Sequence, residues 1–343
     1  MSAAAEDVVT EVPTVEAVSK RAMTLGLGTS IALLAALIIV PLFVKNFIIF
    51  QMTTLLIYGL AVLALNILTG GSGQFSLGQS AFYAVGAYTS AILMEHANMN
   101  YALSLPIAGL ISFAAGFLFG LPALRLSGVY LALATFALAT TIPQVLKLGF
   151  LEPWTGGVQG LVVTKPDAPF GLPISQDMWL YYFTLAITLA IYVGSVNLLR
   201  SRSGRAFMAI RDNEIAASAM GVDVALYKTL AFGVSAGITG IAGGLGAIVV
   251  QFVAPDGYTI ALAISLFLGM VVGGVGWLPG SFIGAAFTIF VPNIAEDIHK
   301  GLSGAVFGAL LFIVIFLVPH GARQLIASLE GRLSRKSPDR LRR

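Results

Sequence analysis

Residues 200–228 read RSRSGRAFMAIRDNEIAASAMGVDVALYK, an island of charge in a chain with only 10% charged residues. Five basic and three acidic side chains lie here between two long apolar segments. We predict two short helices, residues 204–211 capped by Ser203 and residues 213–220 capped by Asp212, because such side chains accept hydrogen bonds from free helix N–H groups. Gly221 suits the left-handed position that ends a helix. Two short helices at a membrane surface suit contact with another protein, and the alternative is a solvated loop that only fixes topology.

The composition excludes an ordinary soluble domain. The chain has 343 residues, 57% of them hydrophobic, and its mean hydropathy is +0.91. We therefore predict an all-α, polytopic helical bundle in the lipid bilayer. The pI near 9.1 comes from bases beside apolar segments, so it reflects membrane topology and indicates no nucleic acid partner. The absence of cysteine excludes disulfides, thiol nucleophiles and thiolate metal sites.

Apolar windows of the length needed to cross a membrane recur along the chain, and we expect about ten spans. They lie at residues 25–44, 47–69, 75–94, 101–122, 127–146, 179–199, 228–251, 259–277, 279–298 and 302–319. With both termini cytoplasmic, only Lys45, Lys147, Lys165 and Lys300 of the 19 basic residues fall outside, which agrees with the positive-inside rule. The predicted parts are a cytoplasmic tail (1–24), a membrane domain (25–322) with an external loop (148–178) and a cytoplasmic loop (200–227), and a basic cytoplasmic tail (323–343).

Two glycine-rich stretches, GGSGQFSLGQS at residues 70–80 and GGVGWLPG at residues 273–280, lie at matching inner positions between consecutive spans. Irregular backbone at membrane depth persists only where it is buried in protein or lines a wet cavity. These stretches are therefore candidates for the translocation pathway or its gate, and plain tight turns are the alternative. The pathway candidates are Gly71, Gly73, Gln74, Ser76, Gln79, Gly273, Gly274 and Gly276.

Elsewhere, glycines recur at four-residue spacing, a pattern that lets helices approach closely. We predict that these pairs serve packing. They are Gly116 and Gly120, Gly233 and Gly237, Gly240 and Gly244, Gly269 and Gly273, Gly280 and Gly284, and Gly304 and Gly308.

The sequence offers no catalytic, metal or cofactor motif. There is no phosphate-binding GxxxxGK[ST] sequence, and the three histidines lack metal-ligand spacing. No carboxylate falls in the middle of an expected span, where ion-coupled carriers generally place one. The interior polar residues are neutral: Gln51, Asn66, Gln74, Gln79, Gln144 and Asn293. Transport energised by another protein fits best. An ion-coupled carrier and a membrane scaffold or enzyme are the alternatives.

Several ordered motifs resemble the LivM-type permeases of bacterial branched-chain amino acid ABC importers. They are LNILTGGSGQFSLGQSAFYAVGAY (65–88), TGGVQG (155–160), the run from residue 200 to 247, VGGVG (272–276) and PHG (319–321). The resemblance covers about residues 47 to 325 and leaves the acidic N-terminal and basic C-terminal tails outside it.

This resemblance implies a permease subunit of the bacterial inner membrane that hydrolyses no ATP itself. Its implied partners are a second related permease, two cytoplasmic ATPase subunits and a periplasmic solute-binding protein. The implied substrates are leucine, isoleucine and valine, with urea, short amides or aromatic amino acids as alternatives for the same type of importer.

The resemblance also implies site residues. Glu214, Ile215, Ala216, Ala217 and Gly221 are similar to the EAA-type loop that docks onto ATPase subunits, although Ile215 here separates the glutamate from the alanines. In that loop the implied apolar anchors are Phe207, Met208, Ile210, Ile215 and Met220, and the implied polar contacts are Arg205, Arg211 and Glu214. The Gly/Pro-rich external loop is a docking surface or a plain connector. Its implied docking residues for the binding protein are Thr155, Gly156, Gly157 and Gly160.

Overall fold

The computed structural model describes residues 34–124, 126, 128–169, 174–298 and 308. It divides into two compact units, residues 1–49 and 50–343. In the described part of the first unit, a helix over residues 34–39 leads into the 3₁₀ turn η1 (Val40–Leu42), where Pro41 occupies a position that needs no N–H donor. The functional residues predicted above all belong to the second unit.

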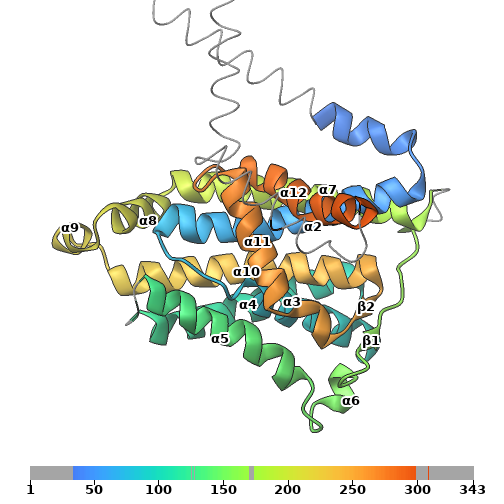
Figure 1. Cartoon of the computed structure of the whole chain (residues 1–343), viewed down its shortest axis with the longest axis horizontal. Helices are drawn as coiled ribbons and strands as arrows, with labels where there is room; N and C mark the ends of the chain where they lie inside the picture. The colour runs from blue at the N-terminus through green and yellow to red at the C-terminus, as the bar shows by residue number, and fades with distance from the viewer. Residues whose placement is uncertain (1–33, 125, 127, 170–173, 299–307, 309–343) are drawn as a thin grey trace, which may run out of the picture. The chain divides into compact units, whose positions relative to one another are not determined.

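Long helices form at every apolar window expected between residues 47 and 298 (Figure 1). They are α2 (Asn46–Asn66), α3 (Gln79–Glu95), α4 (Tyr101–Ala123), α5 (Val129–Leu146), α7 (Gln176–Arg200), α10 (Val224–Val250), α11 (Ile260–Gly273) and α12 (Gly280–Ile298). Six helical segments of the described chain are long and apolar enough to cross a membrane. Helix α3, with 17 residues, and the apolar part of α12 are shorter than the 18 residues required of these segments. The expected windows at 25–44 and 302–319 lie largely outside the described residues, so the total of about ten spans stays a prediction.

Helix α10 forms the centre of the second unit because its glycines let α3 and α4 approach closely. A Cβ atom added to Gly86 would lie 2.0 Å from the Gly240 carbonyl oxygen, and one added to Gly243 would lie 2.0 Å from that of Tyr83. On the α4 side, a Cβ on Gly116 would lie 2.3 Å from the Ala236 methyl group. These distances leave no room for a side chain, so the small-residue packing predicted for α4 and α10 is confirmed.

Helices α11 and α12 also pack closely through glycines. A Cβ on Gly284 would lie 1.8 Å from the Gly269 carbonyl oxygen, and one on Gly273 would lie 2.1 Å from that of Gly280. The packing predicted for these glycines is therefore confirmed as well. Of the last predicted pair, Gly304 lies outside the described residues.

The connecting segments gather at the two ends of α10 (Figure 1). At its beginning lie α8 (Arg202–Asp212) and α9 (Glu214–Ala219), together with the π-helical end of α2, η2 (Ile67–Gly71). At its other end β2 (Phe252–Val253) pairs antiparallel with β1 (Leu161–Val162), close in sequence to α6 (Glu152–Thr155) and η4 (Pro255–Tyr258). We name these the inner end and the outer end, after the sides that the basic residues predict.

Candidate functional site

Helices α8 and α9 form the helix pair predicted from the sequence, and we call residues 202–221 the coupling element after the role predicted for them. Its caps differ from those predicted: Ser201, not Ser203, accepts from the Gly204 N–H, and Asn213, not Asp212, accepts from the Ala216 N–H at 3.0 Å. Ser201 and Asn213 have the extended backbone that a cap requires, whereas Ser203 and Asp212 lie inside α8. Gly221 has the predicted left-handed conformation, with φ +82°.

One face of the coupling element packs on its own bundle. Phe207 is 0% exposed and Ile210 4% exposed, and the Phe207 ring lies 6.1 Å from that of Tyr227 on α10. Ala217 of α9 is buried too. These side chains hold the element on the bundle, and the part that the resemblance gives them in contact with an ATPase stays a prediction.

The opposite face is apolar and exposed. Ile215 is 81% exposed and Met220 85% exposed, while Met208 is 36% exposed. Both Ile215 and Met220 lie at the inner end between charged residues, outside the apolar windows that lipid would cover. These exposed apolar side chains are therefore the part of the element that is free to contact another protein, as predicted for them.

The charged residues of the element connect it to the helices beside it. Lys228 at the start of α10 binds Glu214 with a distance of 2.6 Å between Nζ and Oε2. Arg211 forms an ion pair with Asp212 and donates from its guanidinium to the Gly70 carbonyl oxygen at 2.8 Å. Arg205 is exposed and donates to the Arg200 carbonyl oxygen at 3.2 Å. Arg211 thus joins the coupling element to the first glycine-rich stretch.

Asn66, four residues before the first glycine-rich stretch, binds the second one. The sequence alone identifies this residue only as an interior amide. The Asn66 amide donates to the carbonyl oxygens of Gly274 at 3.2 Å and Trp277 at 3.1 Å, and to the Ser281 hydroxyl at 3.2 Å. Its Oδ1 accepts from the Gly276 N–H at 2.6 Å. A single buried side chain at the end of α2 therefore holds the whole turn between α11 and α12.

Two of the predicted pathway residues, Gln74 and Gln79, have hydrogen-bonded side chains. The Gln79 amide donates to the Ser235 hydroxyl at 2.7 Å and accepts from the Thr239 hydroxyl at 2.8 Å, and Ser235 donates to the Ala64 carbonyl oxygen. The Gln74 amide donates to the Ser72 hydroxyl at 2.9 Å and to the Lys228 carbonyl oxygen at 3.2 Å. Both side chains are buried: Gln79 joins α3 to α10, and Gln74 joins the segment before α3 to the end of α2 and to the start of α10.

The remaining pathway candidates are backbone features of the same region. Ser76 accepts from the Gly78 N–H at 3.2 Å, while Gly71, Gly273 and Gly274 are buried. Gly73 and Gly276 are exposed, with φ of +74° and +79°. Both stretches are thus breaks between helices, as predicted, and their part in translocation stays a prediction.

The external loop is shaped by the residues that resemblance assigned to docking. Thr155 is 3% exposed, and its hydroxyl donates to the Leu146 carbonyl oxygen at 2.9 Å. Gly156, Gly157 and Gly160 all have positive φ, and a Cβ on Gly156 would lie 2.0 Å from the Gly160 carbonyl oxygen. The motif therefore folds the loop, with Thr155 and Gly157 buried in it, and its contact with a binding protein stays a prediction.

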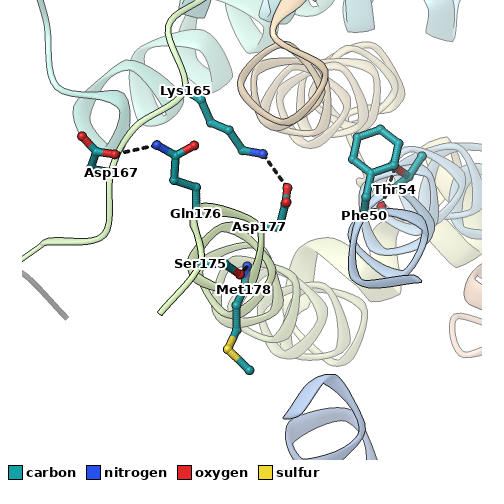
Figure 2. Close-up of polar contacts among 8 residues, drawn as sticks. All are labelled: Phe50, Thr54, Lys165, Asp167, Ser175, Gln176, Asp177 and Met178. Atoms are coloured by element: carbon teal, nitrogen blue, oxygen red, sulfur yellow. Dashed lines mark hydrogen bonds and ion pairs between the residues drawn. The ribbon is translucent and has the colours of Figure 1, made fainter. Parts of the chain in front are cut away.

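Three apolar side chains in or near that motif are exposed, beside polar ones such as Glu152 and Gln159. Trp154, Val158 and Val162 are each more than half exposed, and the His96 ring stacks on Trp154 at 5.3 Å. Figure 2 shows how the second half of the loop is fixed to the first turn of α7, where Lys165 pairs with Asp177 and the Gln176 amide donates to Asp167. The loop thus presents an apolar surface on a defined backbone.

Comparison with known proteins shows the family of the chain. Residues 47–315 match the family described as branched-chain amino acid transport system, permease component. The chain is 32% identical over 292 residues to the high-affinity branched-chain amino acid transport system permease protein LivM of Salmonella typhimurium, covering 78% of this chain and 68% of that protein.

Two further relatives are also named as permease proteins of transport systems. The LivM permease of Escherichia coli is 32% identical over 314 residues, which cover 85% of this chain and 73% of that protein. The autoinducer 2 import system permease protein LsrC of Enterobacter sp. is 28% identical over 211 residues, or 57% of each chain. No solved structure matches the chain.

Proposed function

The chain belongs to the family of permease components of branched-chain amino acid transport systems, and on that premise we propose that it is the membrane-spanning subunit of an ABC importer for leucine, isoleucine and valine. The identity of 32% to two LivM permeases, over most of each chain, carries this proposal. The subunit works beside a second related permease in the bacterial inner membrane. Two ATPase subunits supply the energy, and a binding protein delivers the substrate.

The coupling element is the proposed contact to an ATPase subunit. Its exposed residues Met208, Ile215 and Met220 supply the apolar contact, while Arg205 and the free face of Glu214 supply oriented charge. Phe207 and Ile210 anchor the element to the bundle, so a displacement of α9 is passed on instead of being absorbed by a flexible loop.

The hydrogen bonds of the inner end suggest how that displacement reaches the pathway. Arg211 connects the coupling element to Gly70, and Asn66, one turn earlier in α2, holds the turn between α11 and α12. We propose that both glycine-rich breaks move as one gate when the ATPase subunits close. Neutral groups such as Gln74, Ser76 and Gln79 suit a zwitterion, because charged walls would bind one half of it too firmly.

The external loop is the proposed docking surface for the binding protein. Its apolar side chains Trp154, Val158 and Val162 would make the contact, and the glycine turn at residues 156–160 would hold them in place. A loop of fixed conformation binds with a smaller loss of entropy than a mobile one.

Uptake measurements test the proposed substrate class. Deleting this chain from its host should abolish high-affinity uptake of radiolabelled leucine, isoleucine and valine, and the chain supplied on a plasmid should restore it. Unchanged branched-chain uptake, with loss of urea, amide or aromatic amino acid uptake instead, would assign the same machine to another solute. Gradient-driven uptake by the purified chain in liposomes, without ATP or partners, would favour an ion-coupled carrier.

A further inference from the structure

A cavity of about 450 Å³ opens at the outer end of the bundle, away from the coupling element and the inner gate. Four parts of the chain enclose it: the first half of α2, Tyr83 of α3, the last turn of α10, and the segment from Phe252 to Leu262. Its volume falls in the range of small-molecule sites. Its lining residues are Phe50, Thr54, Ile57, Tyr58, Tyr83, Gly246, Val250, Phe252, Ala254, Asp256, Gly257, Tyr258 and Leu262.

The walls of the cavity are aromatic and aliphatic. The Tyr83 ring lies 6.4 Å from that of Tyr58 and 5.7 Å from that of Tyr258, so the three rings form one continuous surface. Ile57 and Leu262 add aliphatic surface. Such walls favour an aliphatic side chain, and the faces of tyrosine rings also attract an ammonium group.

Asp256 is the charged residue of the lining, which also carries the hydroxyl groups of Thr54 and the three tyrosines. Lys147 is not itself a lining residue, but its Nζ lies 2.5 Å from the Asp256 Oδ1, and the Asp256 side chain is 67% exposed. An adjacent carboxylate and ammonium are the complement of an amino acid zwitterion, whose own ammonium can meet Asp256 while its carboxylate meets Lys147. Because the pair stays in contact with water, it would hold such a ligand only weakly, as a site that must release its ligand requires.

The deep end of the cavity lies beside the closed part of the bundle. Tyr58 is in the middle of α2, and less than two turns further along the same helix Ala64 accepts from the Ser235 hydroxyl, which in turn accepts from Gln79. The cavity is thus open toward the outer end and separated from the glycine-rich gate by a layer of buried hydrogen bonds.

We propose that this cavity is the site in which the permease first receives its substrate, an amino acid with an aliphatic side chain. Asp256 and Lys147 orient the zwitterionic end at the mouth, and the surface formed by Tyr58, Tyr83 and Tyr258 receives the side chain. This proposal rests on the proposed function, and it adds the location and the chemistry of the receiving site.

Cysteine protection tests the cavity directly, because the natural chain contains no cysteine. Val250 lines the cavity and is 52% exposed, so V250C should react with a membrane-impermeant maleimide added to right-side-out vesicles freed of binding protein and ATP. Leucine at ten times its dissociation constant should slow labelling about 10-fold, because roughly a tenth of the sites then remain open. Glutamate should not slow it, since its charged side chain finds no partner among the tyrosines. V158C on the external loop should react equally fast with and without leucine.

Filling the cavity gives a second readout. V250W should lower the kcat/KM of leucine uptake by the complete importer about 10-fold, whereas V193W, at a half-exposed position of α7, should leave it unchanged. Labelling of V250C that leucine does not slow up to its solubility limit, or normal uptake by V250W, would overturn the receiving site while leaving the proposed function intact. Protection by leucine in a chain whose deletion leaves leucine uptake unchanged would keep the site and overturn the proposed function.

Discussion

At the scale of single residues, Asn66 shows how one amide can join two distant parts of a membrane protein. It lies one turn before Gly70, and its side chain binds both edges of a turn more than 200 residues away in sequence. An amide suits this place because it donates and accepts at once, and the turn offers both carbonyl oxygens and an N–H group. No local signal distinguishes Asn66 from the other interior amides, since its partners come from a different part of the chain.

Replacing this residue by leucine should therefore damage both stability and transport. N66L removes the hydrogen bonds to Gly274, Gly276, Trp277 and Ser281, and we expect a loss of about 2–3 kcal/mol in stability from the net value of such bonds. Thermal unfolding of the purified chain and leucine uptake by the complete importer measure the two effects. N197L, at an exposed position of α7, is the control and should behave like the natural chain. Equal melting temperatures for the two variants would contradict the role given to Asn66.

At the scale of elements, the sequence predicts the helices and their breaks better than it predicts which side of a helix faces a partner. Apolar windows locate the long helices because a span needs about 20 such residues. The motif RSRSG, however, contains two serines that could cap the helix. Ser201 is the cap because α8 starts at Arg202. Phe207 and Ile210 are three residues apart and so share the buried face of α8, while Met208 lies on another face. This spacing is a signal in the sequence that could have distinguished the buried residues from the exposed one.

Other features of the site have no local signature at all. Tyr58, Tyr83 and Tyr258 form one surface only after α2, α3 and η4 have packed together. The glycine turn TGGVQG is visible in the sequence, but the burial of Thr155 and its hydrogen bond to the Leu146 carbonyl oxygen are not. Such contacts arise from tertiary packing, which one sequence does not reveal.

The exposed face of α9 makes a prediction for the coupling element. I215D places a charge where we expect an apolar contact with the ATPase subunit, so ATP-driven leucine uptake should fall at least about 10-fold, in line with loss of a buried contact residue. Because Ile215 is 81% exposed in the chain alone, insertion and melting temperature of the isolated permease should not change. I215L keeps the apolar contact and should transport nearly normally. Normal uptake by I215D would place the ATPase contact elsewhere.

The packing of α10 makes a prediction of its own. G243A would bring a methyl group to 2.0 Å from the Tyr83 carbonyl oxygen, so α3 and α10 must separate, at a cost of about 1–3 kcal/mol. G194A on α7 meets nothing within 4 Å and should be neutral or stabilise the helix by up to about 1 kcal/mol. Thermal unfolding of the two purified variants measures the difference. A G243A chain as stable as G194A would contradict close packing at this point.

Across the whole molecule, the inner and outer ends differ in charge. Basic residues are distributed unequally between the two ends. The coupling element and its flanks carry several arginines, whereas the described outer segments carry Lys45, Lys147 and Lys165, of which Lys147 and Lys165 pair with aspartates. That asymmetry predicts the inner end to be cytoplasmic. It also fits the proposed function, in which ATPase subunits act from the cytoplasm on the inner end and a binding protein delivers substrate to the outer end.

Sidedness follows from α7 by simple counting. This one helix separates Val158 of the external loop from Ser218 of the coupling element, so the two positions must lie on opposite sides of the membrane if α7 crosses it. In the cysteine-free chain, V158C should react with an impermeant maleimide in intact cells lacking the outer membrane barrier, and S218C only after permeabilisation. S337C in the basic tail should behave like S218C, because the predicted window at 302–319 returns the chain to the inner side. Labelling of S218C from outside would remove the ATPase contact from the coupling element, whereas external labelling of S337C alone would remove only that last predicted span.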